Sequence, residues 1–197
     1  MRYCNLLRDR YFSPSIQQLG ILIGLASLSA FYIGLILAYA FRIEGDSSWQ
    51  KFHVPQLLWL STALIVTSQL LVEAGKHSLR RALVAKYRMR LAGAVLLGLA
   101  FLSLQVTAGV DLLNQGVGTT ANPHGAAFYV FMGLHATHLI AGLIWLGYVY
   151  HRSRNLQTAT ENDLRKHRIL VSVASMYWHF MGGLWIVLYF FLLRWTS

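Results

Sequence analysis

The sequence predicts an all-α integral membrane protein that folds as a bundle of five transmembrane helices. Hydrophobic residues make up 56% of its 197 residues and charged residues only 12%, about half the charged share of a soluble domain. The hydrophobic residues lie in five long blocks, each close to the roughly 20 residues that a helix needs to cross a bilayer. Isolated strands would leave backbone groups unpaired in lipid. We therefore expect five helices within a single transmembrane domain, residues 1–197.

The first helix is expected at about 16–41. The apolar run before "AYA" exceeds the roughly 7–15 residues of a signal-peptide core, so we expect this helix to be retained. The second helix is expected at about 55–75 and the third at about 91–113. The basic segment between them, "GKHSLRRALVAKYRMR", is expected to form a connection.

The fourth helix is expected at about 125–150 and the fifth at about 169–193. Pro55 and Pro123 lie where the second and fourth helices should begin, and the first turn is where a helix tolerates proline. A second basic connection, "HRSRNLQTATENDLRKHR", is expected between the last two helices.

Lysine and arginine are distributed unequally between the two sides of this topology. Three lie in the N-terminal tail, six in the second connection and five in the fourth, whereas the opposite side carries three. The positive-inside rule then places the N-terminus in the cytoplasm and the C-terminus on the outer side of the membrane. Because topology explains the net charge of +10, no nucleic-acid partner is expected.

Three histidines are expected near the middle of the bilayer. His135 and His138 lie in "YVFMGLHATHLIAGLIW" and share a helix face, and His179 lies in "SMYWHFMGGLW" at a similar depth for a rise of ~1.5 Å per residue. In one interpretation, His138 and His179 ligate the haem of a b-type cytochrome. In the other, neutral imidazoles form hydrogen bonds across helix interfaces worth roughly 0.6–2 kcal/mol each. Small residues beside the histidines indicate close helix packing and favour the second interpretation.

Further polar and aromatic side chains join these histidines in a predicted structural core. Its members are His135, His138, His179, Trp178, Trp185, Thr137 and Gln105. Glu73, near the cytoplasmic end of the second helix, is either a proton- or lipid-facing carboxylate or the partner of Lys76 or His77. We expect no catalytic residue, metal ligand or cofactor site within this chain.

The two histidine segments resemble those of subunit III of the haem–copper terminal oxidases, which reduce oxygen with electrons from cytochrome c or quinol. That family carries a G-x-H-x-x-H segment on its penultimate helix and a W-H-F segment on its last. Here they are "GLHATHLIAGLIW" and "YWHFMGGLW". The stretches "WLSTALIVTSQLL" and "GLAFLSLQ" are also similar, so that the resemblance covers about residues 19–195. Five helices are typical of the shorter bacterial and quinol-oxidase forms.

Three acidic residues of that family are absent. Leu28, Ala108 and Gly182 stand where the family has carboxylates, whereas all three histidines are present. The resemblance therefore implies a divergent subunit III with a mainly structural role, since the acids to which proton collection is assigned are missing.

What the resemblance implies is an accessory, non-redox subunit of an oxygen reductase. Haem and copper would belong to the partner subunits, chiefly subunit I and also subunit II, and bound phospholipid is expected. An accessory subunit of a nitric oxide reductase is the alternative within the same class. The b-type cytochrome that uses His138 and His179 is the alternative from another class.

Overall fold

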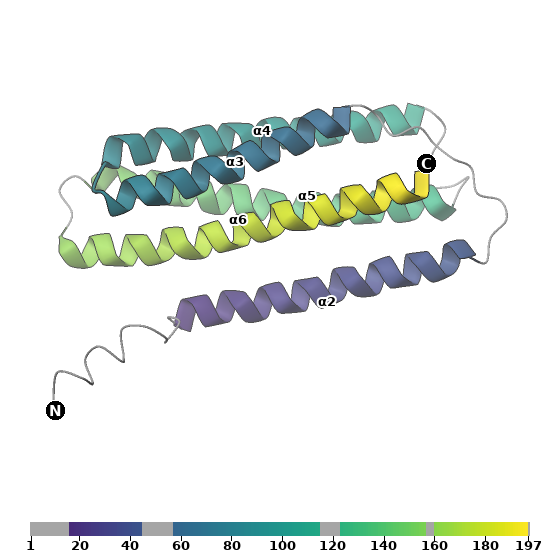
Figure 1. Ribbon diagram of the computed structural model, residues 1–197, viewed down its shortest axis with the longest axis horizontal. Coiled ribbons are helices and arrows are strands. Elements are labelled where there is room, and N and C mark those ends of the chain that lie inside the picture. Colours follow the sequence, from purple (N-terminus) through teal and green to yellow (C-terminus); the bar gives the residue numbers. More distant parts are fainter. Residues whose placement is uncertain (1–15, 45–56, 115–122, 157–159, 197) are drawn as a thin grey trace. The chain divides into compact units, whose positions relative to one another are not determined.

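Each of the five apolar blocks forms one long helix (Figure 1). The computed structural model describes residues 16–44, 57–114, 123–156 and 160–196, and every regular element in these ranges is helical. The elements are α2 (Ile16–Glu44), α3 (Leu57–Arg80), α4 (Val84–Asn114), α5 (Pro123–Arg152), the short 3-10 helix η1 (Ser153–Asn155) and α6 (Glu161–Thr196). All five α-helices are long and apolar enough to span a bilayer. The predicted five-helix class is thus confirmed, while the predicted orientation stays a prediction.

The chain divides into two compact units, residues 1–38 and residues 39–197. Most of α2 belongs to the first unit and is described by itself. Its serine hydroxyls turn back onto their own helix, Ser27 to the carbonyl of Ile23 at 3.0 Å and Ser29 to that of Leu25 at 2.8 Å. Such bonds keep polar side chains satisfied in lipid. The single domain expected over residues 1–197 stays a prediction.

In the second unit, α3 to α6 pack around a common core. Each helix contacts the next one along the chain, and α6 also contacts α3, which closes the ring (Figure 1). The α3–α4 pair has the most extensive contact, as expected of two helices joined by a very short turn. The ring brings residues of α3 and α6 together although they are about a hundred positions apart in sequence.

Helices on the side with the basic connections are longer than hydropathy predicted. α3 ends at Arg80 and not near 75, α4 begins at Val84 and not near 91, and α6 begins at Glu161 and not near 169. Hydropathy marks only the part of a helix that lies in hydrocarbon, and lysine and arginine are themselves good helix formers. The "GKHSLRRALVAKYRMR" connection is therefore mostly helix. Pro123 begins α5 as predicted, whereas Pro55 lies outside the described residues.

The turn between α3 and α4 is a Schellman motif. The backbone N–H of Leu83 donates to the carbonyl of Ser78 at 3.0 Å, and that of Ala82 donates to the carbonyl of Leu79 at 3.1 Å. Ala82 has a φ of 58°, the left-handed conformation that this motif requires and that glycine adopts most readily. An alanine at this position makes the turn strained.

Several basic residues at this end of the bundle hold neighbouring helices together. Arg90 of α4 donates to the carbonyl of Ala74 in α3 at 2.7 Å, and Arg88 lies over the ring of Tyr150 in α5 at 5.8 Å. From the sequence, these arginines were expected only to set the orientation of the chain in the membrane. In the structure they also cap and cross-link the ends of the helices.

Three helices approach one another closely around Trp178 of α6, which is fully buried. A Cβ added to Gly98 of α4 would lie 3.0 Å from the Trp178 indole and 2.7 Å from Leu143. A Cβ added to Gly142 of α5 would lie 3.2 Å from the same indole and 2.9 Å from Tyr177. The indole thus fills the space left by two glycines, and those glycines set the spacing of three helices.

Replacing Ala82 with glycine should stabilise the protein. The substitution removes the strain of a left-handed non-glycine residue, and we expect a gain of about 1 kcal/mol in the free energy of unfolding. The control is Ala85→Gly, at an exposed helical position of α4, where glycine should cost about 0.5–1 kcal/mol. Thermal unfolding in detergent measures both variants. A loss of stability in Ala82→Gly would contradict the assignment of the turn.

Replacing Gly98 with alanine should destabilise the bundle. The added methyl group overlaps an indole that cannot move because Gly142 lies behind it, and overpacking of this kind costs about 1–3 kcal/mol. Gly109, also on α4, has nothing within 4 Å of an added Cβ and provides the matched control. Gly109→Ala should unfold at the same temperature as the unaltered protein or higher. Equal effects of the two substitutions would rule out the proposed packing constraint.

Candidate functional site

The Trp178 indole forms a hydrogen-bond relay through three helices. Its Nε1–H donates to the hydroxyl of Ser68 in α3 at 3.1 Å, and that hydroxyl donates to the carbonyl of Ala94 in α4 at 2.8 Å. Both indole and hydroxyl are buried, where an unpaired polar group would be costly. We call Trp178, Ser68, Ala94, Gly98 and Gly142 the Trp178 layer. Every polar side chain in this layer is paired.

A similar relay starts from Trp185, seven residues further along α6. Its Nε1–H donates to the hydroxyl of Thr62 at 3.0 Å, and Thr62 donates to the carbonyl of Leu58 at 2.8 Å. Next to it, the Gln105 amide of α4 donates to the hydroxyl of Ser61 at 2.9 Å, which donates to the same carbonyl at 2.9 Å. These bonds link α6 and α4 to α3.

His138 lies at the α5–α6 interface. Its ring Nδ1 is 2.6 Å from the carbonyl of Leu134, which also accepts a hydrogen bond from Thr137 at 2.8 Å. The Thr137 side chain is exposed to the outside of the bundle. The contact between helices is made at the backbone instead, because the Tyr177 hydroxyl of α6 donates to the His138 carbonyl at 2.8 Å.

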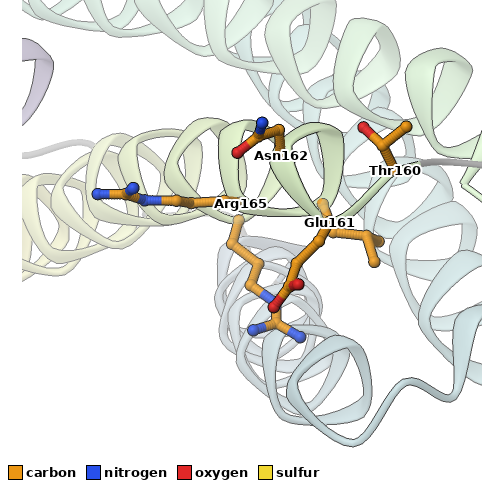
Figure 2. Close-up of a pocket in the computed structure, with 6 residues that line it drawn as sticks. Thr160, Glu161, Asn162 and Arg165 are labelled. Atoms are coloured by element: carbon orange, nitrogen blue, oxygen red, sulfur yellow. The ribbon is translucent and has the colours of Figure 1, made fainter.

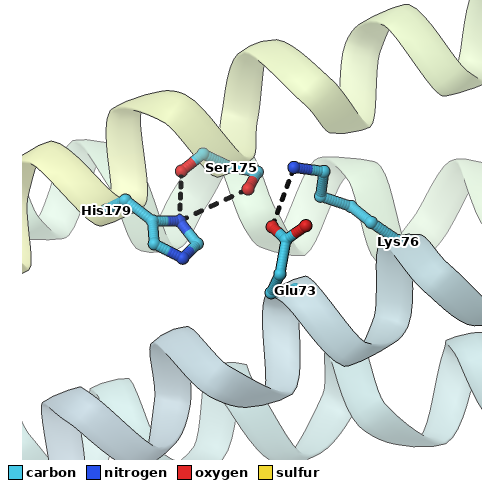
Figure 3. A network of polar contacts seen from close by, with 4 residues as sticks. All are labelled: Glu73, Lys76, Ser175 and His179. Carbon is cyan, nitrogen blue, oxygen red and sulfur yellow. Dashed lines mark hydrogen bonds and ion pairs between the residues drawn. The ribbon is translucent and has the colours of Figure 1, made fainter.

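His179 and Glu73 lie near each other on α6 and α3 (Figure 3). The ring Nδ1 of His179 is 2.8 Å from the carbonyl of Ser175 and 3.3 Å from its hydroxyl. Glu73 forms an ion pair with Lys76 at 2.8 Å, and its side chain is 54% exposed. This pair, one turn apart on α3, is one of the two interpretations that the sequence left open for Glu73.

His135 is the most deeply buried of the three histidines, with 2% of its surface exposed. Its ring lies 5.6 Å from the ring of Trp185 and 6.4 Å from that of Phe101. Neither ring nitrogen has a hydrogen-bond partner among the described residues. We call Trp185, Phe101, His135, Gln105 and Tyr189 the Trp185 layer.

Of the residues in the predicted polar core, Trp178, Trp185, Gln105 and His135 are buried, His138 and His179 are half-buried, and the Thr137 side chain is exposed. The ring nitrogens that bond to carbonyls, Nδ1 of His138 and Nδ1 of His179, do so within their own helices. Cross-helix bonds come from Trp178, Trp185, Tyr177 and Gln105. The role of the histidines as clasps between helices stays a prediction. Within the described ranges, no group of three or more His, Cys, Asp or Glu side chains is placed to hold a metal ion.

Sequence reasoning missed two features of this core. It did not identify Ser68 of α3 as a hydroxyl that bonds to a neighbouring helix. It also overlooked the buried pair of Tyr87 and His167, whose hydroxyl and Nε2 are 3.0 Å apart at the ends of α4 and α6. A histidine within a basic connection gave no signal of burial.

An open pocket of about 790 Å³ lies at the start of α6 (Figure 2). Its lining consists of Thr160, Glu161, Asn162, Leu164, Arg165 and Arg168. Thr160 caps the helix: its hydroxyl donates to the Asp163 carboxylate at 2.6 Å and accepts from the Asp163 N–H at 3.4 Å. This N-cap explains why α6 begins directly after Thr160.

Comparison with known proteins identifies relatives along almost the whole chain. The sequence profile of the family described as cytochrome c oxidase subunit III matches residues 18–197. A cytochrome c oxidase subunit 3 from Synechocystis is 26% identical over 180 residues, covering 89% of this chain and 74% of the relative. A cytochrome c oxidase subunit 3 from Bacillus subtilis is 28% identical over 169 residues, covering 83% and 75%.

A probable quinol oxidase subunit 3 from Staphylococcus saprophyticus is 20% identical over 190 residues, covering 94% of this chain and 92% of the relative. The matched region contains the four helices of the bundle and both histidine segments. The chain belongs to the cytochrome c oxidase subunit III family.

Proposed function

We propose that this chain is an accessory, non-redox subunit of a haem–copper oxygen reductase in a bacterial inner membrane. Its partners would be subunit I, which it would stabilise, and subunit II, with phospholipids bound at its apolar surface. Haem and copper would reside in those partners. The relatives include subunits of both cytochrome c oxidases and quinol oxidases, so either donor is compatible with the proposal.

The direct contact between α5 and α6 favours this proposal over the b-type cytochrome alternative. The Tyr177 hydroxyl bonds to the His138 carbonyl at 2.8 Å, and Gly142 lies directly against Tyr177 and Trp178. Helices in such direct contact have axes about 8–10 Å apart, a space that their own side chains fill. A porphyrin between His138 and His179 would need α5 and α6 to separate. The chain therefore fits a packing role better than an electron-transfer role.

The missing acid at Gly182 supports the same conclusion. A Cβ added at Gly182 would overlap the side-chain amide nitrogen of Gln69 and lie 2.6 Å from its Cδ. That amide nitrogen is 3.5 Å from the carbonyl of Trp178, to which it donates. Gln69 of α3 thus occupies the space in which a side chain at position 182 would begin. A neutral amide between α3 and α6 replaces a carboxylate, which favours packing over proton transfer at this position.

The proposed function predicts that substituting the histidines leaves the haem content unchanged. The complex should be purified through an affinity tag on this chain, and its partners identified by mass spectrometry. We expect haem- and copper-bearing subunits to co-purify. His138→Leu and His179→Leu should keep the same haem content per copy of the largest partner, measured from reduced-minus-oxidised spectra. A haem lost specifically in these variants, with the same partners present, would establish the b-type cytochrome instead.

Gly182→Ala should be destabilising only while Gln69 is present. The new methyl group displaces the Gln69 amide from its place beside Trp178, and we expect a loss of about 1–3 kcal/mol in thermal unfolding experiments. In a Gln69→Ala background the same substitution should become neutral or stabilising by up to about 1 kcal/mol, since alanine favours a helix. Gly183→Ala is the control, because an added Cβ there meets nothing within 4 Å. Additive effects of Gln69→Ala and Gly182→Ala would refute the coupling.

A further inference from the structure

Three buried side chains of the Trp185 layer carry polar atoms that have no hydrogen-bond partner in the described part of the chain. Both ring nitrogens of His135, the side-chain oxygen of Gln105 and the hydroxyl of Tyr189 form no hydrogen bond to the described residues. Their side chains are 2%, 5% and 1% exposed, respectively. Buried polar groups in folded proteins nearly always have a partner, either protein or ordered water. Three exceptions in one layer need a common explanation.

Two of the three side chains lie against one tryptophan, and the third follows a ring that also contacts it. The Trp185 ring is 5.6 Å from the ring of His135 and 6.2 Å from that of Tyr189. It is also 5.2 Å from the ring of Phe101, one helical turn before Gln105. The side chains come from α4, α5 and α6 and meet inside the bundle. Their unpaired atoms are therefore on the inside of the protein and not on its lipid-facing surface.

The hydrogen-bond directions leave the side-chain oxygen of Gln105 without a direct partner among the described residues. The Ser61 hydroxyl uses its only proton on the Leu58 carbonyl, so it must accept from the Gln105 amide nitrogen. The Gln105 oxygen is then left as a free acceptor. A tyrosine hydroxyl and a neutral imidazole each have one proton to donate and a lone pair to accept. Donors and acceptors are both present, but no direct bond joins them.

The rings around His135 do not replace these bonds. A contact between an N–H group and an aromatic face is weak, and it would serve one nitrogen of His135 at most. The Gln105 oxygen and the Tyr189 hydroxyl would still be unpaired. In the apolar interior of a bilayer each such group costs several kcal/mol. A small ligand that both donates and accepts would satisfy the Gln105 oxygen, the Tyr189 hydroxyl and one nitrogen of His135.

We propose that the Trp185 layer is a binding site for ordered water, held by His135, Gln105 and Tyr189. Water accepts from the tyrosine hydroxyl and donates to the amide oxygen and the unprotonated ring nitrogen, which gives it the two to four partners that buried water needs. The chain thus encloses a hydrated polar site inside its transmembrane bundle, toward the end at which α3 begins. This inference does not depend on the proposed function.

The Trp178 layer provides an internal comparison. Its tryptophan is also fully buried and also donates to a hydroxyl of α3. There the Ser68 hydroxyl passes its proton to the Ala94 carbonyl, and the glycines at positions 98 and 142 bring backbone against the indole. The two layers therefore differ in hydration and not in burial.

X-ray radiolytic labelling of the purified complex tests the proposal. Radiolysis forms hydroxyl radicals from water, and these oxidise aromatic side chains beside it. We expect Trp185 and Tyr189 to be labelled several-fold faster than Trp178. His135→Leu should reduce the labelling of both residues, whereas His138→Leu, outside this layer, should not. A density map of the complex that resolves ordered water should show a peak within about 3.2 Å of a His135 nitrogen.

Equal protection of Trp185, Tyr189 and Trp178 in the unaltered complex would overturn the proposal, and so would a water-resolving map without density beside His135. Both measurements use the unaltered chain, so they hold even where His135→Leu lowers the yield. Undiminished labelling of Trp185 in a folded His135→Leu complex would also contradict the assignment of His135 as a ligand of this water.

Discussion

The bundle depends on the packing and hydrogen bonding of one indole, that of Trp178. Lipid removes most of the hydrophobic force between helices, so that close packing and hydrogen bonds must hold a membrane bundle together. Trp178 supplies both, since its ring lies against Gly98 and Gly142 and its N–H bonds to Ser68. This arrangement requires small residues on α4 and α5 and a hydroxyl on α3. The residue types at all three positions follow from the shape of one side chain.

His138, His179 and Glu73 each have a side-chain atom bonded to a group on their own helix. The ring nitrogen Nδ1 is bonded to a backbone carbonyl in both His138 and His179, and Glu73 is paired with Lys76. Side chains engaged in this way favour a rigid neighbour for a catalytic partner over a proton-transfer role. The exterior is apolar along all five helices, as a surface against lipid or another membrane subunit must be. The proposed accessory role rests on this combination.

Sequence reasoning predicts those features that depend on neighbouring residues. Apolar blocks identify the five helices, and Pro123 marks the start of α5. It fails where the contact joins distant positions. Nothing near Gly182 in the chain indicates that Gln69 fills the space beside it, and nothing near Ser68 indicates that Trp178 is its partner. The helix ends were wrong for a different reason, because hydropathy does not detect a helical turn that carries arginine outside the hydrocarbon.

The two tryptophan relays also fix the register of α6 against α3. Trp178 and Trp185 are seven residues apart and therefore lie on the same face of α6, and their acceptors, Ser68 and Thr62, are six residues apart on the antiparallel α3. Sliding one helix by a turn would break both bonds at once and move each indole N–H away from its hydroxyl. In an apolar interior such a loss is heavily penalised. Two equivalent bonds thus select one register of α6 against α3, and that register places the Gln69 amide of α3 at Gly182 of α6.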